Sequence, residues 1–172
     1  MTTAVLFNFI ARDGTSLNFS RKIAPKISPT VKDRVNKQFK SELGVRVRNS
    51  KYDNEYNCHG LTFAAKLGWF FDVRLMLKSH DYKQIGFCAN FDIDKIPIDI
   101  PVMRGDIVVY YLGDESKVTH TGIIWSKRIR NGGLELTVLS KWGSHSEYFH
   151  RHDKVPVAVY GKTIEIWTDR NI

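Results

Sequence analysis

A change of pattern near residue 106 constrains the fold more than any other feature of this sequence. From there, three apolar runs, DIVVYYL, THTGIIW and ELTVLSKW, are separated by the turn-like segments GDES and RNGG. Val, Ile, Tyr and Thr favour strands, whereas Gly, Asn, Asp and Ser favour the turns that join antiparallel neighbours. An antiparallel sheet of about five strands is therefore expected. The predicted strands are 106–112, 119–125, 135–142, 155–160 and 163–167.

The first half of the chain carries helical signals instead. Ser28 followed by Pro29 predicts the start of a helix, and Gly44 predicts its end. One apolar stripe recurs every four residues at Val31, Val35, Phe39 and Leu43. A second helix of about 20 residues is predicted from Cys58 to about Lys78, where proline is absent and apolar residues are frequent. Helices followed by strands predict an α+β fold with the Cys58 helix packed on the sheet.

Positive charge is concentrated in one segment. The 172-residue chain has a net charge of +8, and residues 21–51 hold ten Lys or Arg but only two acidic residues, so this segment carries the whole excess. Such a stripe can bind an anionic polymer, or it can be the solvated face of a helix. Phe39 is the one aromatic residue in this segment, which weakens an interpretation in which nucleic-acid bases stack on the protein. Nucleic acid is nevertheless kept as an open alternative.

Targeting signals and disulfide patterns are weak in this sequence. No run approaches the roughly 18 apolar residues that a membrane span requires. The N-terminal MTTAVLFNFIARDG lacks the leading positive charge of a secretory signal. We expect a protein that is cytoplasmic as synthesised, with any export following a route without a classical signal peptide. Two cysteines, Cys58 and Cys88, argue against a disulfide scaffold.

The segment EYNCHGLTFA places a thiol where a helix is expected to begin. Backbone N–H groups at a helix start favour a thiolate and can hold an oxyanion, which predicts a lowered pKa for Cys58. Asn57 is expected to cap the helix, and Gly60 to leave room for a substrate backbone. Tyr56 is a candidate for the oxyanion site through its hydroxyl group. The alternative is that Cys58 packs as a small apolar residue, but its polar and small neighbours favour a nucleophile.

A thiol nucleophile needs a base, and His120 is the best-placed histidine. It opens the strand THTGIIW. Because alternate strand residues share a face, His120 and Gly122 are expected on the face opposite Thr121. If that face packs on the start of the Cys58 helix, the imidazole reaches the sulfur. The competing interpretation is a structural histidine with satisfied hydrogen bonds.

Taken together, NCHGLTFA and MRGDIVVYYLGDESKVTHTGIIW resemble the papain-like NlpC-type cysteine peptidases and amidases, including CHAP domains. The shared pattern is Asn or Asp before Cys, a small residue and Gly opening a helix, then GD before an apolar strand, then His-x-Gly. The resemblance spans roughly residues 52–145. It implies a papain-like catalytic core over 51–172, with residues 1–50 as a basic N-terminal extension packed on the same domain.

The resemblance also implies a Cys nucleophile, a His base and a third polar residue on the next strand that orients the His. Ser140 is the preferred candidate, because Lys141 is a poor partner for a histidine that becomes cationic. Glu147 is the alternative if its loop folds back. The nearby HSEYFHRH contains His145, His150 and His152, but neither CxxC nor HExxH occurs, so no metal or other cofactor is expected.

These features predict a cysteine hydrolase that cleaves an amide or isopeptide bond through an acyl-enzyme on Cys58. By resemblance, the expected substrate is a peptide of the cell wall, and the basic stripe can hold the enzyme to an anionic wall polymer. Two alternatives stay open. One is a toxin or effector that acts as an amidase or acyltransferase on a protein. The other is a catalytically inactive module that binds polyanions.

Overall fold

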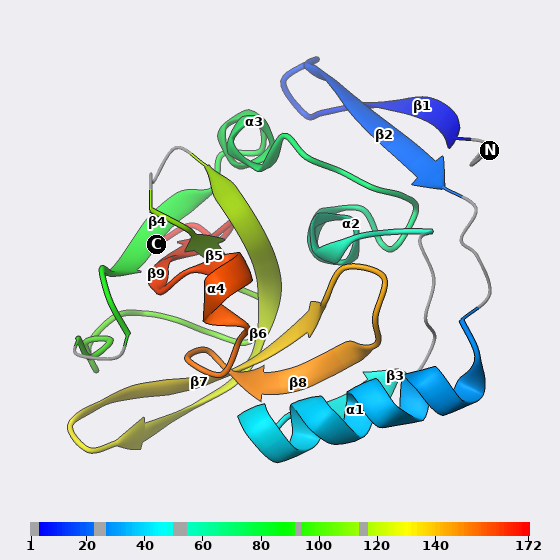
Figure 1. The fold of residues 1–172 in the computed structure, drawn as a ribbon. Helices are drawn as coiled ribbons and strands as arrows, with labels where there is room; N and C mark the ends of the chain where they lie inside the picture. Colours follow the sequence, from blue (N-terminus) through cyan, green and yellow to red (C-terminus); the bar gives the residue numbers. More distant parts are fainter. Residues whose placement is uncertain (1–3, 23–26, 50–54, 92–93, 114–116) are drawn as a thin grey trace.

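The chain has an α+β fold in which a seven-stranded antiparallel sheet is the largest element (Figure 1). The computed structural model describes residues 4–22, 27–49, 55–91, 94–113 and 117–172. The strand order in the sheet is β3-β8-β7-β6-β5-β9-β4. The strand bounds are β3 Arg46–Asn49, β4 Lys83–Cys88, β5 Ile107–Tyr111, β6 Val118–Arg130, β7 Gly133–Lys141, β8 Glu147–Arg151 and β9 Thr163–Thr168.

The predicted α+β class and the central meander are confirmed. Strands β5, β6 and β7 follow one another in sequence and pair as antiparallel neighbours, and β9 pairs on the other side of β5. The β6–β7 turn contains Asn131 and Gly132 with φ values of 52° and 75°. These positive angles match the twist of a tight hairpin, which explains why RNGG signalled the turn correctly.

The expected number of strands was too low, and one predicted strand is wrong. Residues 46–49 and 83–88 add the two edge strands β3 and β4, and residues 147–151, where no strand was predicted, form β8. The predicted strand 155–160 is mostly a short helix, α4 (Val157–Tyr160). Pro156 lies at its N-terminal end, and Gly161 ends it with a φ of 84°. A side chain at Gly161 would collide with the Tyr111 carbonyl, so the chain turns there before β9 begins.

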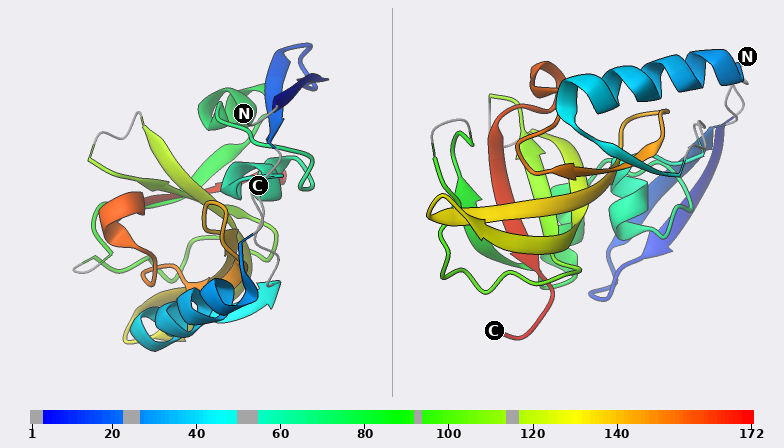
Figure 2. Two further views of the ribbon diagram at one scale, coloured as in Figure 1. Left: turned by 45° about the vertical axis from the view of Figure 1, so that its right-hand side comes forward. Right: turned by 90° about the horizontal axis from the view of Figure 1, so that it is seen from below.

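Helix α1 (Pro29–Leu43) has the predicted bounds. The Ser28 side chain accepts a hydrogen bond from the Val31 N–H at 3.4 Å, and Gly44 ends the helix with a φ of 66°. Phe39 and Leu43 of the apolar stripe pack against the core of the main sheet. The helix lies beside β8 and β3 (Figures 1 and 2). Because β3 belongs to the main sheet, residues before position 50 contribute an edge strand to that sheet as well as a helix.

The predicted 20-residue helix after Cys58 is wrong. Two short helices occupy the segment, α2 (Cys58–Phe63) and α3 (Val73–Ser79). Between α2 and α3, Ala65 and Lys66 have positive φ values of 44° and 71°, so the right-handed helix cannot continue through them. The chain then folds back, and Gly60 and Gly68 come so close that a Cβ on Gly60 would lie 1.9 Å from the Gly68 oxygen.

Two apolar clusters cover the two faces of the sheet. Val108, Tyr110 and Val138 belong to the first, which also includes Trp142. Val109 and Tyr111 belong to the second, whose other members include Ala64, Phe70 and Val73 around α2 and α3. We call these the inner face and the α2 face. This alternation along β5 follows from the pleat of a strand.

A separate hairpin of β1 (Ala4–Ile10) and β2 (Ser16–Lys22) lies on the side of α2 away from the main sheet (Figures 1 and 2). Leu17 and Phe19 join the cluster of the α2 face, and the Phe19 ring stacks on Phe70 at 4.9 Å. Among the described residues, no helix combines the length and apolar character that crossing a membrane requires.

Candidate active site

Cys58 is the first residue of α2, and Asn57 caps the helix as predicted. The Asn57 Oδ1 accepts the Gly60 N–H at 2.8 Å. The same side chain also binds the backbone of Phe70, donating to its oxygen at 2.7 Å and accepting from its nitrogen at 3.2 Å. The Asn57 carboxamide thus caps α2 and also holds the backbone at Phe70, in the loop that follows α2. The position of the thiol is therefore fixed by both the helix and the loop.

The sulfur lies beside the part of β6 that extends past its pairing with β7. The β6–β7 ladder ends at the pair Ile123–Leu139, whereas β6 continues along β5 to Val118. The backbone N–H of Thr121, in this extension, hydrogen-bonds the Cys58 sulfur and so acts to lower the pKa of the thiol. Thr121 directly follows His120, so the structure brings the predicted nucleophile next to the strand position of the predicted base.

His120 lies on the opposite face of β6 from the one that α2 covers. Thr121 faces α2, where its hydroxyl group donates to Thr62 Oγ1 at 3.0 Å. His120 points to the inner face and stacks on the ring of Tyr160 in α4 at 3.9 Å. The prediction that His120 and Thr121 occupy opposite faces is confirmed. The condition that the His120 face packs on α2 is wrong, because it is the Thr121 face that does so.

The imidazole of His120 is the least satisfied polar group of the site. His120 is fully buried, and neither ring nitrogen has a hydrogen-bond partner among the described residues. Burial lowers the pKa of His120 well below its usual range, and nearby His150 and His59 lower it further. Buried polar groups are normally paired, so an unpaired imidazole on the residue next to Thr121, whose backbone contacts the thiol, indicates a functional constraint.

The thiol is also buried, and its pKa is raised rather than lowered as the sequence predicted. Cys58 is 6% exposed, and burial raises the pKa of its thiol to about 11. A hydrogen bond from Thr121 and the charge of Lys141 oppose this rise without overcoming it. Helix α2 has six residues, so the field at its start is weak. The resting site therefore contains a neutral thiol and a neutral imidazole.

His59 is a second imidazole near the sulfur, with Nδ1 at 3.7 Å from Sγ. Thr121 donates its hydroxyl proton to Thr62, so its oxygen accepts the His59 Nδ1–H at 2.9 Å. Thr62 in turn donates to the Cys58 carbonyl at 3.0 Å. The His59 nitrogen nearest the sulfur thus carries a proton and cannot act as a base. Burial lowers the pKa of His59 to about 4.

Ser140 does not orient His120, although it shares the inner face with it. Its hydroxyl group bonds His150 Nε2 at 2.7 Å and accepts the Trp142 Nε1–H at 2.9 Å. His150 Nδ1 donates to the Arg151 carbonyl at 2.7 Å, because a carbonyl can only accept. His150 Nε2 is therefore the acceptor for Ser140. These three side chains form a closed network that leaves His120 out.

The other predicted site residues, Glu147, Tyr56 and Gly60, form ion pairs, hydrogen bonds or close backbone contacts on the α2 face. Glu147, the alternative orienter, forms ion pairs with Arg48 and Lys66, each at 2.5 Å. The Tyr56 hydroxyl donates to Glu147 at 2.6 Å rather than facing an oxyanion site. At Gly60 the Gly68 backbone fills the space that was expected to admit a substrate.

The histidine-rich segment HSEYFHRH contains strand β8 and its flanking residues. Within the described parts of the chain, no three His, Cys, Asp or Glu side chains gather as a metal site requires. Alternation along β8 separates Glu147 on the α2 face from His150 on the inner face.

The basic segment maps largely onto α1 and β3. Exposed cations there include Arg34, Lys37, Lys40, Arg46 and Arg48. Arg48 pairs with Glu147, and the Arg46 guanidinium lies 4.9 Å from the Phe149 ring centroid. The predicted stripe also contains Lys26 and Lys51, which lie outside the described residues.

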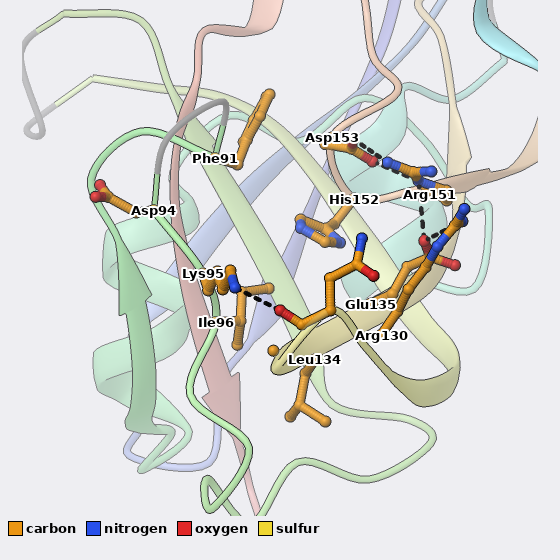
Figure 3. Close-up of a pocket in the computed structure, with 12 residues that line it drawn as sticks. Phe91, Asp94, Lys95, Ile96, Arg130, Leu134, Glu135, Arg151, His152 and Asp153 are labelled. Atoms are coloured by element: carbon orange, nitrogen blue, oxygen red, sulfur yellow. Dashed lines mark hydrogen bonds and ion pairs between the residues drawn. The ribbon is translucent and has the colours of Figure 1, made fainter.

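A polar cavity of about 310 Å³ lies at the β6–β7 hairpin and the end of β8 (Figure 3). Its charged side chains are largely paired with each other: Glu135 binds Arg130 and Arg151, and Asp153 binds Arg151. The Lys95 ammonium donates to the Asn131 carbonyl. Neither Cys58 nor His120 lines this cavity.

Sequence reasoning missed Lys141 as a neighbour of the thiol. Strand alternation places Lys141 on the face opposite Ser140, but nothing in the sequence showed that α2 covers that face.

No protein-family model, curated protein or solved structure was found to match this chain.

Proposed function

We propose that this protein is a cysteine hydrolase, a peptidase or amidase that cleaves an amide or isopeptide bond through an acyl-enzyme on Cys58. One observation carries the proposal. A thiol fixed by the Asn57 cap contacts the backbone of Thr121, and the preceding residue, His120, is a fully buried imidazole with no partner among the described residues.

Because the pKa of Cys58 is raised and the pKa of His120 is lowered, the resting site does not hold a preformed thiolate–imidazolium pair. The thiol proton is therefore transferred during the attack. In this scheme His120 turns from the inner face, where it stacks on Tyr160 in the resting structure, toward the sulfur beside Thr121 and accepts the thiol proton as the sulfur bonds to the carbonyl carbon. The carbon–nitrogen bond then breaks, and His120 returns the proton to the leaving amine. Water, deprotonated by the same imidazole, releases the acid and restores the thiol. If another amine replaces water, the same steps transfer the acyl group.

The resemblance to NlpC-type enzymes supports a peptide of the cell wall as substrate. Export without a classical signal peptide is part of this proposal. The exposed cations of α1 and β3 support a role for an anionic polymer in holding the enzyme near its substrate.

An acylation assay tests the proposal. The chain is incubated with p-nitrophenyl acetate, and release of p-nitrophenol is followed while mass spectrometry locates acetylated residues. We expect acetyl-Cys58 that forms and turns over. Cys58→Ala should abolish it, and Cys88→Ala is the matched control because Cys88 is also buried, with a thiol pKa raised to about 11. Unchanged p-nitrophenol release by Cys58→Ala would overturn the proposal. Peptidoglycan and protein substrates then identify the bond.

A second candidate is an inactive module that binds polyanions, favoured by the exposed cations of α1 and β3 and by the buried thiol. It predicts affinity for anionic polymers that falls steeply with salt. It also predicts no acylation of Cys58. The two assays together separate these functions.

A further inference from the structure

Lys141, the last residue of β7, is a lysine with no exposed surface. Lysine is seldom fully buried, because removing an ammonium group from water is costly. The rest of its strand is consistent with this position: Ser140 faces inward, and Lys141 faces the side that α2 covers.

The surroundings of Lys141 belong to the candidate active site. Its ammonium group donates to the His145 carbonyl at 2.6 Å and lies 4.9 Å from the Tyr56 ring centroid. Tyr56 precedes Cys58 by two residues. On the same face, Leu139 clusters with Tyr56 and with Leu61 of α2. The start of α2 and the end of β7 are thus packed together.

Strand register places Lys141 on the α2 face, close to the strand position that contacts the sulfur. Ile123 pairs with Leu139 in the antiparallel β6–β7 ladder. Continuing that register by two residues brings Lys141 opposite Thr121, whose N–H contacts the sulfur. The charge of Lys141 lowers the pKa of Cys58, in opposition to burial, which is the largest influence.

We propose that Lys141 supplies the fixed positive charge that stabilises the Cys58 sulfur as it loses its proton to His120. This inference rests on the proposed function for its catalytic meaning, and its electrostatic part can be measured without turnover. Lys141 acts through space on the sulfur and exchanges no proton in this scheme. A fixed ammonium beside a thiolate also explains how attack proceeds although the resting thiol is protonated.

The experiment measures the rate at which iodoacetamide alkylates Cys58 between pH 7 and pH 10, in the Cys88→Ala background. Thiolate is the reactive form, so the rate follows the thiolate fraction. We expect Lys141→Met to slow alkylation about tenfold at each pH, which corresponds to a rise of about one unit in the thiol pKa. Lys141→Arg should restore most of the rate, because the charge returns.

Lys66→Met is the matched control. The Lys66 ammonium lies 5.7 Å from the same Tyr56 ring, but it pairs with Glu147. We expect the alkylation profile of this variant to stay unchanged. Equal profiles for Lys141→Met and the parent would overturn the inference, and equal slowing in Lys66→Met would show that loss of ring packing, not charge, is responsible.

A measurement on an intact lysine covers the case in which Lys141→Met does not fold. Coupled charges shift each other's titration. NMR titration of the Lys141 side chain should therefore give a higher pKa in Cys58→Asp, where a carboxylate stands in for the thiolate, than in Cys58→Ala. An identical lysine pKa in both proteins would overturn the inference. If the lysine pKa shifts but Cys58 is never acylated, the charge pair stands and the hydrolase proposal fails.

Discussion

Two buried histidines on the inner face of the sheet, His120 and His150, differ in what their nitrogens contact. Both are at most 3% exposed. His150 uses both nitrogens, one with Ser140 and one with the Arg151 carbonyl. His120 has aromatic contacts with Tyr160 and Tyr110 but no hydrogen bond within the described residues. An imidazole that stabilises a fold is normally paired, so we infer a structural role for His150, and the contrast supports the proposed role of His120 as a base.

The sharpest way to break this contrast is the same substitution at both positions. His120→Leu removes two unsatisfied buried nitrogens and the proposed base. We expect Cys58 acylation to fall roughly 10²- to 10⁴-fold, the usual contribution of general base catalysis. The free energy of unfolding should not decrease, because no hydrogen bond is lost. Acylation kinetics and urea unfolding measure the two effects. A destabilised His120→Leu with undiminished acylation would reverse the assignment.

His150→Leu should give the opposite result. It leaves the Arg151 carbonyl and the Ser140 hydroxyl without their partner, which costs about 1–3 kcal/mol of stability at neutral pH. Acylation by the folded fraction should stay close to that of the parent. Urea unfolding at pH 7, together with the same acylation assay, checks both expectations.

The pH dependence of the free energy of unfolding provides a further test of the structural role of His150. Burial lowers the pKa of His150 from 6.5 to about 4, so between these values the unfolded chain binds more protons than the folded one. His150 therefore imposes no penalty above pH 6.5, and stability is lost as the pH falls towards 4. The loss corresponds to roughly 3 kcal/mol for this imidazole. His150→Leu should flatten that part of the pH dependence, and an unchanged slope would contradict the assigned protonation.

The fold was predictable from the sequence where local patterns decide the structure. The Ser28 cap, the Gly44 stop and the Asn131–Gly132 turn all act within a few residues of their own position. Strands β3 and β4 were missed because edge pairing depends on distant partners; β3, for example, pairs with a strand about a hundred residues away. Strand β8 was missed although it pairs with the preceding β7, because its sequence, EYFHR, lacks an apolar strand pattern. The long helix failed because the Asn57 carboxamide binds the Phe70 backbone, a contact that no periodicity reveals.

For the candidate site, the sequence predicted that the segments of Cys58 and His120 meet, but not that His120 faces away from α2. Cys58 and His120 stand out through their sequence neighbours, and the structure brings their segments together. Burial of the thiol and the pairing of Glu147 with Arg48 arise from how α2 and β3 pack on the sheet. Such contacts set the charge state of the site, so the sequence alone suggested a thiolate where the structure holds a thiol.

The smallest effect is expected from Ser140→Ala. Ser140 shares a face with His120, which made it the natural candidate to orient that imidazole, but its hydroxyl group is engaged by His150 and Trp142. The substitution should therefore cost about 1 kcal/mol of stability and change acylation by less than about twofold. Its pH–rate profile should overlay that of the parent, because no group that contacts His120 is removed. A fall of tenfold or more, with a shifted profile, would mean that Ser140 changes partner during turnover and that the two histidines are not independent.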